Sequence, residues 1–73
     1  MNIETILNEV KEYAHECVWK NNFECINASD AMIEAYLRPL MNDKEFEIFL
    51  RYRELMLRVF KETVKEELNW LNI

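Results

Sequence analysis

The sequence predicts an all-α fold, a compact three-helix domain with a long C-terminal helix. The 73 residues include no glycine and a single proline, so residues that interrupt helices are rare. Apolar residues recur at helical spacing along most of the chain. An asparagine suited to cap a helix stands at each expected start, at Asn2, Asn27 and Asn42. We therefore expect one helical domain that spans residues 1–73.

The first helix is expected from about Ile3 to Lys20. Asn2 can cap it, because its side-chain oxygen can accept a hydrogen bond from an amide of the first turn. The Asn21-Asn22 pair is expected to end the helix, and residues 23–26 to form a short connection. One apolar stripe marks the face expected to enter the core: Ile3, Ile6, Leu7, Val10, Ala14, Cys17 and Val18.

The second helix is expected from about Ala28 to Leu37. Asn27 and Asp30 have the spacing of a capping pair at its start. Pro39 disfavours a helical backbone at the preceding residue, so the helix should end near Arg38. The side chains expected to face inward are Ala31, Met32, Ala35 and Tyr36.

The third helix, expected from Asp43 to about Trp70, is the element on which the others should pack. Asn42 and Glu45 predict a reciprocal capping box, and a hydrophobic pair flanks it. No glycine or proline interrupts this run. Its main apolar stripe should form the core: Phe46, Phe49, Leu50, Met56, Leu57, Phe60, Val64, Leu68 and Leu71.

A second apolar stripe on this helix consists of Ile48, Tyr52, Leu55 and Val59. The four residues have the alternating four-and-three spacing of a helix seam. A single neighbouring helix cannot cover both stripes, and burying each such side chain is worth about 1.5–3 kcal/mol. We therefore predict a symmetric homodimer in which two copies of the long helix meet here. The alternative is that this stripe receives a foreign protein.

The formal net charge of −5 lies mostly in the N-terminal part of the chain. Residues 1–42 contain seven acidic and three basic side chains, and the remainder contains seven and six. An acidic surface disfavours the phosphate backbone of nucleic acids and favours a basic protein surface. A basic row at Lys44, Arg51 and Arg58 leaves open a transcription regulator that reads DNA with the long helix.

Metal, cofactor and enzymatic chemistry are not expected. Glu12 and His15 match the Glu-x-x-His pattern of di-iron bundles, but those ligands project inward and these two point away from the apolar stripe. His15, Cys17 and Cys25 fall short of the four ligands of structural zinc. Without glycine there is no phosphate-cradling loop and no nucleophile elbow.

The compartment expected is the cytoplasm. The first residues lack the basic and then apolar layout of a signal peptide, and no run approaches ~18 apolar residues. In a reducing cytoplasm both cysteines, Cys17 and Cys25, should be free thiols. Frequent Ile, Asn, Lys and Glu are typical of an AT-rich genome, such as that of a low-GC bacterium or its phage.

His15 and Trp19 are candidates for binding a partner. Trp19 falls on the polar side of the first helix, one turn after His15. An exposed indole at such a place is typical of a binding hot spot. The alternative is that Trp19 packs beneath the connection over residues 21–26.

Arg53 is a further candidate for partner binding, because it falls at the centre of the main apolar stripe. An unpaired guanidinium there would cost several kcal/mol, on the order of a broken buried ion pair. We expect it to pair with Glu34 or Asp30, and the alternative is that it presents itself to a partner.

These features predict a small acidic helical interaction protein that binds and regulates or inhibits another protein. If the gene belongs to a mobile element, an anti-defence inhibitor is one version of this hypothesis. An accessory subunit of a larger enzyme and the DNA-reading regulator are the alternatives.

Overall fold

The structure, a computed structural model, describes residues 2–71, with the backbone alone for residues 21–24, 26 and 71. The described chain forms the helices α1 (Ile3–Ile26), α2 (Asp30–Leu37), α3 (Asp43–Arg51) and α4 (Arg53–Leu71). The all-α fold and the long C-terminal helix are confirmed. The number of helices was predicted wrongly, since residues 2–71 form four instead of three.

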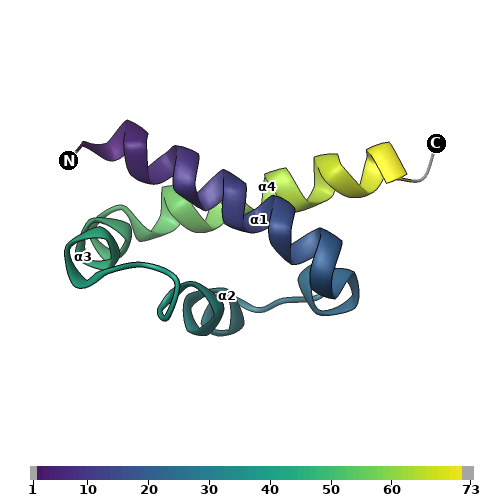
Figure 1. Ribbon diagram of the computed structural model, residues 1–73, viewed down its shortest axis with the longest axis horizontal. Helices are drawn as coiled ribbons and strands as arrows, with labels where there is room; N and C mark the ends of the chain where they lie inside the picture. The colour runs from purple at the N-terminus through teal and green to yellow at the C-terminus, as the bar shows by residue number, and fades with distance from the viewer. Residues whose placement is uncertain (1, 72–73) are drawn as a thin grey trace.

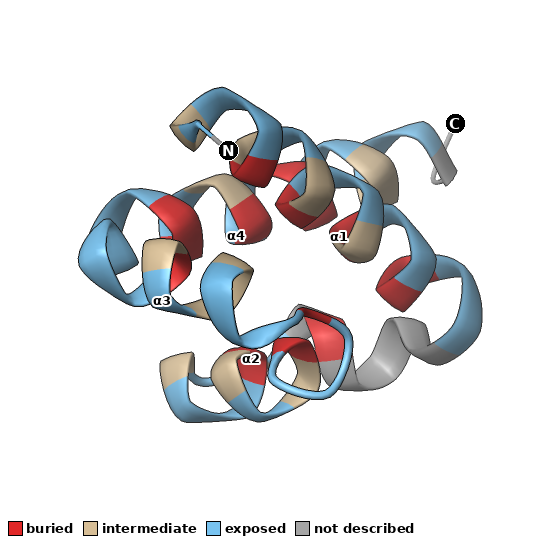
Figure 2. Ribbon diagram, turned by 60° about the vertical axis from the view of Figure 1, so that its left-hand side comes forward, coloured by how far each residue is buried: buried red, intermediate tan, exposed pale blue. Residues whose placement is uncertain are grey.

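The helices α1 and α4 cross as one layer, and α2 and α3 lie along one side of it (Figure 1). The buried residues lie on the sides of the helices that face one another (Figure 2). Among the described residues, no helix combines the length and the apolar character needed to cross a membrane. The core consists of Ile6, Val10, Ala14, Cys17, Val18, Cys25, Ile33, Leu37, Met41, Phe49, Met56, Leu57, Phe60 and Val64.

The start of α1 and its apolar face were predicted correctly. The Asn2 side chain accepts a hydrogen bond of 2.9 Å from the Thr5 amide. Five of the seven residues of the stripe are buried, and the other two, Ile3 and Leu7, pack against the core. The predicted end was wrong, because the helix continues through Asn21-Asn22 to Ile26 and leaves no connection at 23–26. Asparagine lowers helix propensity by less than about 0.7 kcal/mol per residue, which packing readily offsets.

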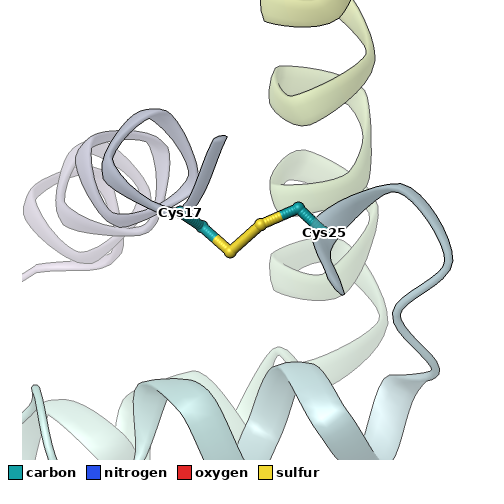
Figure 3. Close-up of a disulfide and its surroundings, with 2 residues drawn as sticks. All are labelled: Cys17 and Cys25. Atoms are coloured by element: carbon teal, nitrogen blue, oxygen red, sulfur yellow. A yellow bond between two sulfur atoms is a disulfide. The ribbon is translucent and has the colours of Figure 1, made fainter. Parts of the chain in front are cut away.

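Cys17 and Cys25 form a disulfide, so the prediction of free thiols was wrong (Figure 3). Their Cα atoms are 6.3 Å apart, whereas eight residues of straight helix would separate them by about 12 Å. The axis of α1 therefore turns between the two cysteines, and its last part approaches α2 (Figure 1). The prediction failed because it considered only the compartment, while the bend brings the two side chains together inside the core.

The start of α2 lies two residues later than predicted, at Asp30 rather than Ala28. Ser29 is the N-cap, and its hydroxyl accepts a hydrogen bond of 3.3 Å from the Met32 amide. Asn27, the predicted cap, instead ends α1. The end of α2 was predicted correctly, because Arg38 is the C-cap directly before Pro39.

The buried face of α2 was also predicted wrongly. The residues in the core are Ile33 and Leu37, whereas three of the four predicted residues are exposed: Ala31, Met32 and Ala35. Tyr36, the fourth, is half-buried and meets the Phe60 ring edge-on at 6.2 Å between centroids. Because apolar residues surround this short helix on nearly all sides, its own pattern does not select a face.

The predicted long helix is divided at Tyr52 into α3 and α4. Its capping box is confirmed, since the Asn42 amide donates to Glu45 Oε1 and the Glu45 amide to Asn42 Oδ1, each at 2.8 Å. Tyr52 leaves the helical region with φ −114° and ψ 38°. Its amide still donates to the Ile48 carbonyl at 3.2 Å, and its carbonyl accepts from the Met56 amide at 2.9 Å. The chain therefore changes direction within a single residue.

The position of Arg53 gives the physical reason for this break. In one straight helix Arg53 would lie in the middle of the main apolar stripe. After the break its side chain is 44% exposed and its Nε pairs with Glu34 of α2, as predicted. The remainder of the main stripe enters the core, except that Leu50 is exposed and the Leu71 side chain lies outside the described residues.

The same break changes the second stripe. Ile48 and Val59 pack against the core, whereas Tyr52 and Leu55 are exposed at the corner between α3 and α4. The four residues therefore do not form a continuous seam on one helix, and that part of the prediction was wrong. Self-association through them stays a prediction.

Candidate protein-binding surface

His15 and Trp19 of α1 are both held by one carboxylate of α4. His15 Nδ1 lies 2.8 Å from Glu67 Oε2. Trp19 Nε1 donates a hydrogen bond of 3.0 Å to Glu67 Oε1. Both oxygens of Glu67 are thus engaged, and the predicted position of His15 and Trp19 on one exposed side is confirmed. Packing of Trp19 beneath residues 21–26 is excluded, because the residue is 67% exposed.

Trp70 adds a second exposed indole to this side of α4. It lies three residues after Glu67, so the two side chains leave the helix in similar directions. Trp70 is 76% exposed, the largest value among the large apolar residues described. The sequence analysis took it only as the end of the long helix, although its position outside the main apolar stripe was a usable signal. We call His15, Trp19, Glu67 and Trp70 the tryptophan surface.

A groove of about 290 Å³ lies between α1 and α4 beside His15. It is lined by Lys11 and His15 of α1 and by Val59, Glu62, Thr63 and Glu66 of α4. Neither Glu62 nor Glu66 has a cation within 4.0 Å among the described residues. The groove therefore offers two carboxylates next to the tryptophan surface.

Arg53, the third predicted partner-binding residue, is not part of this surface. It lies at the start of α4 and pairs with Glu34 of α2, which raises the pKa of its guanidinium. A second ion pair, between Lys61 and Asp30, joins the same two helices and lowers the pKa of the Asp30 carboxyl. These contacts give Arg53 a structural role in attaching α2 to α4.

The corner between α3 and α4 exposes a separate apolar patch. Leu50, Tyr52 and Leu55 are exposed there, and they line a shallow groove of about 420 Å³ together with Arg51 and Arg58. The predicted basic row is divided here, because Arg51 ends α3 whereas Arg58 belongs to α4. No single helix face therefore presents all three cations of that row to DNA.

A pair of carboxyl groups joins α1 to α3, which the sequence analysis did not anticipate. The Oε2 atom of Glu9 is buried and has no hydrogen-bond partner among the described residues. Burial, followed by a hydrogen bond to Glu45 and the charges of Glu45 and Glu12, raises the pKa of Glu9 to about 7. The Asn42 amide and the hydrogen bond to Glu9 lower the pKa of Glu45. A protonated Glu9 that donates a hydrogen bond to ionised Glu45 accounts for both the raised pKa of Glu9 and the lowered pKa of Glu45.

The residues considered as metal ligands do not form one cluster. Glu12 and His15 are exposed, and His15 is engaged by Glu67. Cys17 and Cys25 are joined to each other. The described part of the chain contains no group of three or more His, Cys, Asp or Glu residues positioned to hold a metal ion.

The tryptophan surface therefore combines two exposed indoles, of which Trp19 is oriented by Glu67, and it adjoins an acidic groove. An exposed, oriented indole beside carboxylates can pack against another molecule and hydrogen-bond to it. Comparisons with protein-family models, with curated proteins and with solved structures found no match for this chain.

Proposed function

We propose that the chain is a small acidic interaction protein that binds, and so regulates or inhibits, another protein through the tryptophan surface. The observation that carries the proposal is the state of Trp19, which is 67% exposed yet has its indole nitrogen bonded to Glu67. An indole held in this way offers a large apolar area with little remaining freedom to lose on binding. Central, oriented tryptophans are among the commonest binding hot spots.

The exposure of two tryptophans on neighbouring helices supports the same function. Trp19 and Trp70 leave much of their apolar area in water, although burying such a side chain is worth about 1.5–3 kcal/mol or more. A partner protein that covers them recovers this free energy. If the gene is carried by a mobile element such as a phage, an inhibitor of a host defence protein is one version of the proposal.

Affinity capture from the native host tests the proposal. Tagged wild-type protein should enrich a specific partner, and Trp19→Ala should reduce its recovery by about tenfold or more, the effect of losing one hot spot of about 1.4 kcal/mol or more. Met32→Ala is the matched control, because Met32 is exposed on α2, which does not contribute to the tryptophan surface. If Trp19→Ala recovers the same proteins in the same yield, the tryptophan surface is not the binding site.

We further propose that the protein self-associates through the corner between α3 and α4. The exposed Leu50, Tyr52 and Leu55 support this proposal, because they form an apolar patch on a small molecule. Sedimentation equilibrium at tens of micromolar should detect a dimer that Leu55→Glu dissociates. If the wild-type protein stays monomeric, self-association through this patch is contradicted, and a different protein would have to cover it.

The cytoplasm remains the proposed place of action. The Cys17–Cys25 disulfide weighs against it, because such bonds are rare in reducing compartments. Rapid alkylation of thiols in host cells, followed by mass spectrometry, decides the matter. Two alkylated cysteines would support the cytoplasm, and two protected cysteines would contradict it.

A further inference from the structure

Two carboxylates without a cation partner among the described residues line the groove beside the tryptophan surface. Between α2 and α4 the acids that face the neighbouring helix are neutralised: Asp30 pairs with Lys61 and Glu34 with Arg53. In the groove between α1 and α4, Glu62 and Glu66 lie one helical turn apart with no cation within 4.0 Å among the described residues. Lys11 is the single lysine or arginine in that lining.

The groove adjoins an aromatic side chain that also attracts cations. His15 lines the groove and pairs with Glu67, which also accepts a hydrogen bond from Trp19. These contacts connect the acidic groove to the exposed indole. The face of an indole attracts ammonium and guanidinium groups through its quadrupole. A guanidinium fits both elements best, because it binds carboxylates through two parallel hydrogen bonds and stacks on aromatic rings.

We infer that the groove between α1 and α4 receives an arginine of a basic segment of the partner protein. This inference rests on the proposed function and specifies the chemistry of the partner. Charge complementarity is the reason for the choice, since Glu62 and Glu66 line the groove against Lys11. The other cationic candidate, His15, is already paired with Glu67. An acidic segment or a nucleic-acid phosphate would meet like charges there.

Titration with capped hexaarginine tests this directly, with capped hexalysine and hexaglutamate as comparison peptides. Calorimetry should show saturable binding of hexaarginine, weaker binding of hexalysine and none of hexaglutamate. In a Trp70→Phe background, the remaining tryptophan fluorescence reports on Trp19 and should change with the same dissociation constant.

A pair of double variants with equal charge change locates the site. Glu62→Gln/Glu66→Gln should raise the dissociation constant for hexaarginine about tenfold, which corresponds to about 1.4 kcal/mol. The control Glu47→Gln/Glu54→Gln removes two exposed acids of α3 and α4 outside the groove and should leave the constant within about twofold, as expected for distant surface charges. Circular dichroism confirms that both variants fold.

Three outcomes overturn the inference. Wild-type protein that shows no saturable binding has no such site. Equal weakening by both double variants means that only the overall acidity matters. The third outcome concerns a dimer of the wild-type protein. If hexaarginine dissociates that dimer, and Glu62→Gln/Glu66→Gln does not form it, the groove is occupied by a second copy of this chain.

The inference and the proposed function fail separately. If the captured partner requires Trp19 but binds Glu62→Gln/Glu66→Gln normally, the arginine site is wrong and the proposed function stands. If Trp19→Ala leaves capture unchanged while hexaarginine binding still requires the groove, the proposed function fails and the groove retains its affinity for cations.

Discussion

Two turning points of the chain behave in opposite ways. At Asn21-Asn22 the residues favour the end of a helix, and α1 nevertheless continues to Ile26. At Tyr52 no glycine or proline is present, and the helix nevertheless ends. Local propensity is misleading at both places, because it amounts to less than about 0.7 kcal/mol per residue.

The difference shows that burial decides where the helices end. Continuation of α1 carries Cys25 into the core, where it is 7% exposed and bonded to Cys17. The break at Tyr52 removes Arg53 from the apolar stripe while Phe49 and Met56, on either side, stay fully buried. Each such side chain is worth about 1.5–3 kcal/mol, several times the propensity of one residue.

Removing the disulfide tests the first turning point and should have the largest effect. Cys17→Ala/Cys25→Ala should lower the free energy of unfolding by about 2–3 kcal/mol, the chain-entropy contribution of so short a loop. Wild-type protein treated with a reductant is the control and should unfold at nearly the same temperature as the double variant. If oxidised and reduced wild type melt together, the disulfide does not stabilise the bend.

Removing the cap of α3 tests whether that short helix depends on its own start signal. Asn42→Ala should lower the free energy of unfolding by about 1 kcal/mol, since it leaves the Glu45 amide without its acceptor. Urea denaturation measures this loss. Asn8→Ala, at an exposed position inside α1, is the matched control and should have little effect or be slightly stabilising. Equal results for the two variants would contradict a role for the capping box.

The ion pair between Arg53 and Glu34 tests the second turning point. A double-mutant cycle with Arg53→Met and Glu34→Gln should give a coupling free energy of about 0.5–1 kcal/mol, as is usual for a partly exposed pair. Affinity capture of the partner should be unaffected. If Arg53→Met abolishes capture while the melting temperature is unchanged, Arg53 is a recognition residue.

A dependence on pH is expected at the contact between α1 and α3. Because the pKa of Glu9 is raised to about 7 in the folded protein, folded molecules bind more protons than unfolded ones between about pH 4.5 and 7. Stability should therefore fall as the pH rises through this window. The lowered pKa of Glu45 acts in the opposite direction, but below its usual range near pH 4.5.

Glu9→Gln should reduce this loss of stability. Thermal unfolding of both proteins from about pH 5 to about pH 8 measures this loss. As the pH rises, Glu9→Gln should become more stable relative to wild type. Glu47→Gln, an exposed acid of α3 whose pair with Arg51 spans 3.5 Å, is the control. Parallel pH profiles for wild type and Glu9→Gln would contradict the raised pKa.

Features that depend on one helix were predictable, whereas features that depend on distant residues were not. The core face of α1 and the capping box of α3 follow from local spacing and are confirmed. The buried face of α2 was missed because apolar residues occur on nearly all sides of this short helix, although Ile33 and Leu37, one turn apart, bury more apolar area than alanine. The exposed side of Trp19 was predictable from its place opposite the stripe. Its partner Glu67 was not, since 48 residues separate them.

The bonds that Glu67 makes to His15 and Trp19 have a consequence for any attempt to imitate the protein. The proposed epitope is discontinuous, because two of its side chains belong to α1 and the carboxylate that orients them belongs to α4. A synthetic peptide that copies α1 carries the indole but not its orientation, so it should compete poorly for the partner. If α1 separated locally from α4, the contacts of Glu67 to His15 and Trp19 would be lost. A bound partner that requires these contacts would therefore stabilise the packing of α1 on α4.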